Sequence, residues 1–234
     1  MQIGILQTGQ SPDALRNEMG DYPDLFTRLL QGRGLTFRTW HVEAMQFPGS
    51  IHDAEGWLIT GSRHGAYEDH PFIKPLEDFI RAAYAAHVPM VGICFGHQII
   101  AQALGGKVEK YKGGWAVGPQ DYDFGGEHLT LNAWHQDQVV EKPAEAAVIA
   151  SNEFCAFPAL VYDDRALTVQ AHPEFRDDFL SGLMDTRGKG RVPDALMDAA
   201  RARMGPPNSS SAMADRIAAF FLQPREREGI SRRA

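Results

Sequence analysis

The sequence predicts an α/β fold in which a mostly parallel sheet is flanked by helices. Over residues 1–104, short apolar runs of strand length alternate with longer segments of helical spacing, which is typical of a parallel sheet with helices on both faces. After Gly105-Gly106 come short strand-like pieces without helices between them, which indicate a small antiparallel extension. From residue 174 onward the spacing is helical again, so we also expect C-terminal helices.

The first part of the chain is expected to supply four strands and two helices, followed by a helical pattern over residues 99–104. Asp21 and Gly34 flank the first helical segment and are residue types that begin and end helices. Pro71 precedes the second helical segment, where proline is tolerated. The expected strands are residues 3–6, 35–41, 56–60 and 90–93, and the expected helices are residues 23–33 and 72–86.

The second part is expected to begin with the antiparallel pieces and to end in helices. Gly125-Gly126 is a candidate hairpin turn. The charged end, residues 225–234, is expected to fray. The expected strands are residues 107–111, 115–124, 129–133 and 147–150, the expected helices are residues 174–183, 194–204 and 212–222, and residues 205–211 are a loop.

The C-terminal helices carry apolar residues at helical spacing, and such stripes usually face a core. The sequence therefore predicts a main domain over residues 1–187 and a helical extension over residues 188–234 that packs on the same domain. The expected apolar anchors are Phe179, Leu183, Met197, Phe220 and Phe221.

Composition limits the classes of function. The chain has 234 residues, 44% of them hydrophobic, which suffices for one enzyme core. A formal charge of −7 with scattered basic residues argues against nucleic-acid binding, and no apolar run is long enough for a membrane span or a signal peptide. Two cysteines far apart cannot form a disulfide framework, so we expect a cytoplasmic protein.

The most informative segment is Gly-Ile-Cys-Phe-Gly-His-Gln, residues 92–98, which lies between an apolar strand-like run and a helical pattern. Glycines on both sides of Cys94 relieve the crowding of a sharp strand-to-helix turn. The helix that follows directs unpaired N–H groups at the sulfur, which favours the nucleophilic thiolate. The alternative is that Cys94 is a small buried apolar residue, the role we expect for Cys155.

A second segment could supply the base that a cysteine nucleophile needs. In Gln-Ala-His-Pro-Glu, residues 170–174, a short apolar run ends at His172, and Glu174 follows two residues later. A histidine can take the thiol proton, and a carboxylate can orient the imidazole ring. Glu174 has an alternative interpretation as an acidic residue in the first turn of a helix.

Together these two segments resemble the cysteine and histidine-proline-glutamate signatures of class I (triad) glutamine amidotransferases. The resemblance covers about the first 180 residues. Leu-Ile-Thr-Gly-Ser, residues 58–62, is similar to the oxyanion-strand segment of the family, and residues 135–139 are similar to its histidine-x-aspartate-x-valine segment. Within the family the chain is similar to stand-alone GMP-synthase-like members and to γ-glutamyl peptidases. The resemblance implies a flavodoxin-like sheet and an amidotransferase domain over residues 1–187.

The resemblance also implies a mechanism. Cys94, His172 and Glu174 would form a catalytic triad that releases ammonia from the glutamine side chain through a γ-glutamyl thioester. The oxyanion hole would use backbone N–H groups of Phe95 and of Gly61-Ser62. The residues expected to bind the amino-acid end of the substrate are Gln98, Trp134, His135 and Gln136, although Gln98 could instead solvate the start of its helix.

No cofactor and no metal are expected. The sequence has no dinucleotide-binding glycine pattern and no Walker loop, and the loop of a complete GMP synthase is also missing. His64 and His70 lie in a polar loop, and no histidine pair has zincin spacing. We therefore expect a small-molecule substrate, glutamine or a γ-glutamyl compound, and a possible separate synthase subunit that accepts ammonia.

Three alternatives remain open from the sequence. The same triad could act on a larger leaving group, as in a γ-glutamyl peptidase or amide hydrolase. A non-catalytic regulatory relative is disfavoured because all three triad residues are present. In a cysteine α/β-hydrolase the histidine would follow a separate acid, whereas here the acid comes two residues after the histidine.

Overall fold

The computed structural model describes residues 1–225 and has a seven-stranded central sheet. The first five strands from one edge are parallel, and the last two are antiparallel to their neighbours. This is the predicted mostly parallel α/β fold. In spatial order the strands are β2 (Thr36–His41), β1 (Gln2–Gln7), β3 (Gly56–Ile59), β4 (Met90–Ile93), β11 (Ala166–Val169), β10 (Ala159–Tyr162) and β9 (Ala147–Val148).

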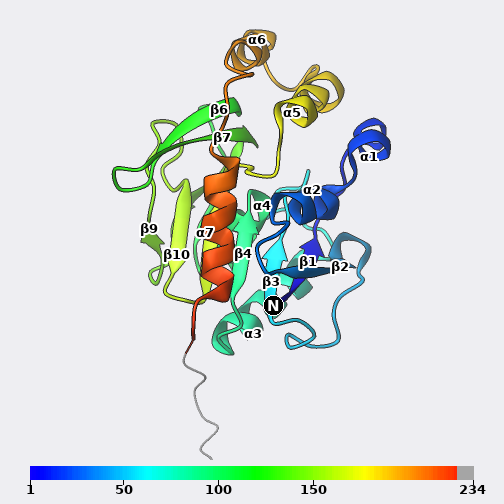
Figure 1. Ribbon diagram of the computed structural model, residues 1–234, viewed down its shortest axis with the longest axis vertical. Helices are drawn as coiled ribbons and strands as arrows, with labels where there is room; N and C mark the ends of the chain where they lie inside the picture. The colour runs from blue at the N-terminus through cyan, green and yellow to red at the C-terminus, as the bar shows by residue number, and fades with distance from the viewer. Residues whose placement is uncertain (226–234) are drawn as a thin grey trace, which may run out of the picture.

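Helices cover both faces of this sheet, because each has one apolar side to bury. Helices α2 (Tyr22–Leu29) and α7 (Ser210–Leu222) pack on one face, where α7 crosses in front of the strands in Figure 1. Helices α3 (Ile73–Ala85) and α4 (Phe95–Ala103) pack on the other. The sheet is therefore buried on both sides, and its side chains divide between two apolar clusters.

The antiparallel extension consists of two separate pairs of strands. Strand β5 (Lys107–Lys110) pairs with β8 (Asp137–Glu141), and β6 (Ala116–Asp123) pairs with β7 (His128–His135). The predicted hairpin turn at Gly125-Gly126 is confirmed, and both glycines have positive φ angles of 72° and 99°. Residues 147–150 were wrongly expected in this extension. Strand β9 instead pairs with β10 at the edge of the central sheet.

The remaining helices lie mainly beyond the carboxyl ends of the strands. They are α1 (Asp13–Met19), the short helices η1 (Val42–Ala44) and η2 (Met184–Gly188), α5 (Asp177–Leu183) and α6 (Asp194–Ala202). Figure 1 shows α5 and α6 at the same end of the molecule as β6 and β7, and α6 contacts β6 while α5 contacts β7. All five expected apolar anchors of the C-terminal helices are buried.

Several boundaries differ from the sequence-based expectation. The helix expected from residue 174 begins only at Asp177, so Glu174 lies in a turn before it. Helix α1 and strands β8 and β10 were not anticipated. Of the end expected to fray, residues 226–234 lie outside the described residues. No helix among the described residues is long and apolar enough to cross a membrane.

Candidate active site

Cys94 lies at a sharp turn between β4 and α4. Its φ of 53° and ψ of −102° are unusual for a residue with a side chain, so the surrounding structure must hold it there. Two glycines make the turn possible. A Cβ on Gly92 would collide with the backbone carbonyl of Gly96, and a Cβ on Gly96 would collide with the carbonyl of Ile59. The turn places the cysteine before the first residue of α4, where backbone N–H groups have no partner within the helix.

His172 comes to the same end of the sheet because β11 lies directly beside β4. Val169 pairs with Ile93 in parallel register, so the chain segments that follow both strands leave the sheet together. His172 Nδ1 lies 2.6 Å from Glu174 Oε1, and both side chains are buried. The structure thus brings the three predicted triad residues together, with Glu174 on the Nδ1 side of the imidazole ring.

The electrostatics of this group favour a protonated His172. Burial alone would lower the pKa of His172, but the Glu174 carboxylate and the nearby Cys94 sulfur act in the opposite direction and outweigh it. The net shift in the His172 pKa is upward. A protonated His172 can donate a hydrogen bond toward the Cys94 sulfur.

Two residues that were not predicted from the sequence hold this segment in place. The backbone carbonyl of the buried Asn132 accepts a hydrogen bond from the His172 N–H at 2.7 Å, and the Asn132 side-chain amide donates to the Phe175 carbonyl at 2.9 Å. The Phe175 ring stacks on the imidazole of His172, with centroids 3.9 Å apart and planes 4° apart. Both contacts fix the orientation of His172. They could not be predicted from the sequence, because β7 and residues 172–175 come together only in the fold.

Cys94 and His172 open into a cleft of about 390 Å³. Five further residues that were predicted for the site line it, namely Ser62, Gln98, Trp134, His135 and Gln136. Glu174 lies behind His172 and does not line the cleft. The other lining residues are Tyr22, Arg63, His64, Gly65, Tyr67, Glu68, Lys110, Trp115, Asp137, Phe175, Arg187 and Arg191.

Two of the predicted substrate contacts are partly engaged within the protein. The Gln98 side-chain amide donates to the Asp137 carbonyl at 2.8 Å and to Gln170 Oε1 at 3.1 Å. His135 Nδ1 lies 3.2 Å from the same Asp137 carbonyl. Burial lowers the pKa of His135 to about 3, so its ring is neutral. These contacts tie α4 and β7 to the start of β8 along one wall of the cleft.

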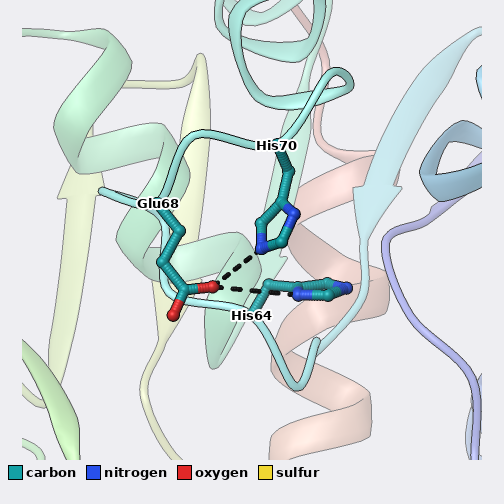
Figure 2. A group of neighbouring side chains, drawn as sticks. All are labelled: His64, Glu68 and His70. Atoms are coloured by element: carbon teal, nitrogen blue, oxygen red, sulfur yellow. Dashed lines mark hydrogen bonds and ion pairs between the residues drawn. The ribbon is translucent and has the colours of Figure 1, made fainter.

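Another wall is the loop that follows β3. His64, Glu68 and His70 converge in this loop, and Figure 2 shows one carboxylate oxygen of Glu68 facing both imidazole rings. Tyr67 fastens the loop across the cleft, because its hydroxyl donates to Asp137 Oδ1 at 3.2 Å. These histidines were expected in a polar loop, but the folding of that loop onto Glu68 was not expected from the sequence.

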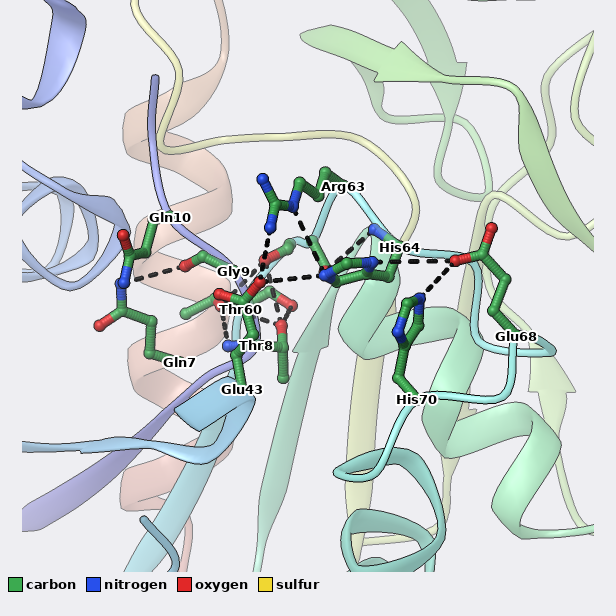
Figure 3. Close-up of polar contacts among 12 residues, drawn as sticks. Gln7, Thr8, Gly9, Gln10, Glu43, Thr60, Arg63, His64, Glu68 and His70 are labelled. Atoms are coloured by element: carbon green, nitrogen blue, oxygen red, sulfur yellow. Dashed lines mark hydrogen bonds and ion pairs between the residues drawn. The ribbon is translucent and has the colours of Figure 1, made fainter. Parts of the chain in front are cut away.

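Thr8 contacts residues 60–61, next to the peptide expected to serve the oxyanion hole (Figure 3). The Thr8 hydroxyl lies 3.0 Å from the Thr60 carbonyl and 3.1 Å from the Gly61 carbonyl, and its N–H donates to Thr60 Oγ1 at 3.1 Å. Because C=O and N–H point in opposite directions across a trans peptide, the contact to the Gly61 carbonyl directs the Ser62 N–H away from Thr8. A Cβ on Gly61 would lie only 2.9 Å from His172 Cε1, so this peptide is next to the candidate base.

The chain belongs to the class I glutamine amidotransferase family, since residues 29–178 match the family model described as "Glutamine amidotransferase class-I". This confirms the resemblance seen in the motifs. Gamma-glutamyl peptidase 4 of Arabidopsis thaliana is 30% identical over 233 residues, which cover 91% of this chain and 92% of that protein. A glutamine-hydrolyzing GMP synthase of Azoarcus sp. is 32% identical over 161 residues, which cover 58% of this chain but only 30% of that protein.

Solved structures support the fold. The crystal structure of a glutamine amidotransferase from Methylobacillus flagellatus superposes with a TM-score of 0.75, covering 97% of this chain and 96% of that chain. The sequence identity between the two is 23%. The likeness therefore extends over nearly the whole length of both chains and concerns the arrangement of the elements.

Proposed function

We propose that this protein is a glutamine-amidotransferase-type hydrolase that releases ammonia from the glutamine side chain. The observation that carries the proposal is the convergence of Cys94 and His172 at the ends of neighbouring strands, with Glu174 2.6 Å from the far nitrogen of the imidazole. A strained cysteine at a strand-to-helix turn, with a base and an orienting acid, is the arrangement of a nucleophilic acyl-transfer enzyme.

In the first half of the reaction the Cys94 thiolate attacks the γ-carboxamide carbon of the substrate. The resulting oxyanion accepts hydrogen bonds from the backbone N–H groups of Phe95 and Ser62. The Ser62 N–H belongs to the same peptide group as the Gly61 carbonyl. His172 then gives its proton to the departing nitrogen. The C–N bond breaks, ammonia leaves, and a γ-glutamyl thioester remains on the sulfur.

In the second half His172 takes a proton from a water molecule, and the hydroxide attacks the thioester carbonyl. The C–S bond breaks, the thiolate returns, and glutamate leaves. Glu174 accepts a hydrogen bond from the Nδ1–H of His172 throughout and stabilises the imidazolium in each half of the reaction. The mechanism needs no cofactor.

The amino-acid end of the substrate would lie against the wall made by α4 and β7. We assign it to Gln98, Trp134, His135 and Gln136, all of which line the cleft. Since the Gln98 amide nitrogen already donates to Asp137 and Gln170, its oxygen is the group left for the substrate amine. The neutral His135 adds no charge that would repel that amine.

A second candidate, hydrolysis of γ-glutamyl peptides, is favoured by the size and charge of the cleft. A volume of about 390 Å³ falls in the range of sites for ligands larger than a single amino acid. Lys110, Arg187 and Arg191 line it and could face the carboxylate of a leaving amino acid or peptide. The γ-glutamyl peptidase relative, which aligns over nearly its whole length, supports this candidate.

The proposal extends to the partner and the compartment of the enzyme. A separate synthase subunit would accept the released ammonia, as the partial match to a GMP synthase suggests. Cys94 and Cys155 are both free thiols, which suits the reducing cytoplasm. We also propose that the helical extension from residue 188 onward forms one unit with the amidotransferase domain over its described part, residues 188–225, because Met213 and Ile217 of α7 pack in the same cluster as Ile3 and Phe26.

The test is a direct comparison of leaving groups. The purified chain is incubated with glutamine and with a panel of γ-glutamyl amides and dipeptides, and the release of glutamate and of amine is measured. Turnover of glutamine supports the first candidate, and turnover of dipeptides without glutamine supports the second. Absence of glutamate release from every member of the panel would contradict both.

A further inference from the structure

The cluster of His64, Glu68 and His70 at the mouth of the cleft has the donor set of a transition-metal site. His64 Nδ1 lies 3.8 Å from Glu68 Oε2, and His70 Nε2 lies 2.8 Å from the same oxygen (Figure 2). All three donor atoms lie within 4.8 Å of one another. None of these residues takes part in the proposed hydrolysis.

We propose that these three residues bind a zinc ion. Zinc accepts imidazole nitrogen and carboxylate oxygen at roughly 2.0–2.2 Å, and two histidines with one glutamate is a known ligand set for zinc sites that keep an open position. In a tetrahedral site with such bonds the ligand atoms would lie roughly 3.3 Å apart. The separations of Glu68 Oε2 from the two imidazole nitrogens, 2.8 Å and 3.8 Å, bracket that value, and the two nitrogens lie within 4.8 Å of each other, so side-chain rotations would bring the three atoms to the required spacing.

A carboxylate behind His64 supports this assignment. His64 presents Nδ1 to the cluster, while its other nitrogen, Nε2, lies 3.0 Å from Glu43 Oε1, and Figure 3 shows the ring between Glu43 and Glu68. Metal-binding histidines usually donate their second N–H to a carboxylate, carbonyl or water, which fixes the tautomer and the ring orientation. Arg63 also approaches Glu43, at 3.5 Å, and helps to hold it.

The rings are also held by apolar packing. The buried Phe72 stacks under His70, with planes 17° apart, and its centroid lies 5.8 Å from that of His64. The two imidazole centroids are only 4.0 Å apart. Two protonated rings this close would repel each other, whereas two neutral rings that share a cation would not.

The proposed ion would be reached from the cleft. His64 and Glu68 line the same cleft as Cys94, so the proposed ion would lie at the edge of that cleft. A thiolate and a histidine in that cleft could bind zinc themselves, and the test must separate the two possibilities.

The test is therefore made in a Cys94→Ser background, by isothermal titration of the metal-free full chain with zinc chloride. We expect one equivalent to bind. Adding His70→Ala or Glu68→Gln should weaken binding at least tenfold, and adding Glu43→Gln should weaken it roughly 10- to 100-fold through loss of ring orientation. Titration with cobalt chloride should give the visible absorption bands of a tetrahedral site, which His70→Ala removes.

His52→Ala, in the same background, is the matched control, because His52 is an exposed histidine outside the cluster. Its zinc affinity should equal that of the background. Thermal melting of each metal-free variant reports whether it is folded. The proposal is overturned if the Cys94→Ser chain binds no zinc, or if folded His70→Ala and Glu68→Gln variants bind it as tightly as the background does.

Discussion

The aromatic ring of Phe175 lies flat against the imidazole of His172, with the ring planes 4° apart and the centroids 3.9 Å apart. The candidate base is thus fixed by a hydrogen bond to Glu174 in the plane of its ring and by Phe175 on one face. A base that must exchange protons with sulfur, a leaving amine and water gains from such a fixed position.

We expect Phe175→Leu to lower kcat about tenfold while KM changes little, because the imidazole loses the surface that holds its plane. Steady-state assays with the best substrate of the panel measure the effect. Phe179→Leu is the matched control, since Phe179 is equally buried in the same cluster but does not stack on His172. Equal loss of kcat in both variants at equal stability would show that the stacking has no special role.

Replacement of the orienting acid should change both the rate and its pH dependence. Glu174→Gln is expected to lower kcat on the order of 10²–10⁴-fold, because the amide no longer fixes the tautomer of His172. The Glu174 carboxylate raises the pKa of His172, so its loss lets the imidazolium deprotonate at lower pH. The alkaline limb of the rate profile should therefore move to lower pH, and a profile with an unmoved alkaline limb would contradict the assignment.

The oxyanion segment offers a test away from the reacting atoms. Thr8→Val removes a hydroxyl that lies within hydrogen-bond distance of the Thr60 and Gly61 carbonyls and keeps the side-chain shape, while the Thr60 hydroxyl still donates to the Gly61 carbonyl. We expect kcat to fall up to roughly tenfold with little change in KM, because the Ser62 N–H is held less firmly. Thr168→Val is the control, since Thr168 is equally buried but bonds to His97. A similar kcat in the two variants would show that Thr8 does not position the oxyanion segment.

The basic side of the cleft should matter only for larger substrates. Arg191→Ala is expected to raise KM roughly two- to fivefold for γ-glutamyl dipeptides with a free carboxylate, the size of effect that an exposed charge gives. Glutamine has no such group beyond the scissile bond, so its kcat/KM should stay the same. Lys189→Ala, a neighbouring exposed cation that does not line the cleft, is the control. A rise in KM for glutamine as large as that for dipeptides would contradict this assignment.

Much of the fold could be predicted because its strands are short apolar runs bounded by turn residues. Strands β8 and β10 could not, for different reasons. Residues 137–141 follow directly on β7, so no turn signal in the sequence separates the two strands. Residues 159–162 are separated by only three residues from the apolar run at residues 166–169, so the sequence does not mark them as a strand of their own. Residues 147–150 looked like another antiparallel piece, because the pairing of β9 with β10 depends on a partner that the sequence did not reveal.

The triad candidates could be found from sequence because each lies next to a strand end and within a specific local pattern. The residues that hold or surround them could not. Asn132 reaches residues 172–175 from a strand forty residues earlier, and Arg187 and Arg191 enter the cleft from the segment between α5 and α6. The spacing of His64, Glu68 and His70 matches no helical metal motif. The loop alone brings them together, so no sequence pattern marks them as a group.

The central claim is that Cys94 carries the γ-glutamyl group, and covalent trapping tests it most directly. An electrophilic diazoketone analogue of glutamine is incubated with the protein, and peptide mapping by mass spectrometry locates the adduct. We predict one equivalent on Cys94, with turnover lost in proportion. Burial raises the pKa of the Cys155 thiol to about 12, so that residue should stay unlabelled. An adduct on Cys155, or full activity in Cys94→Ala, would contradict the account.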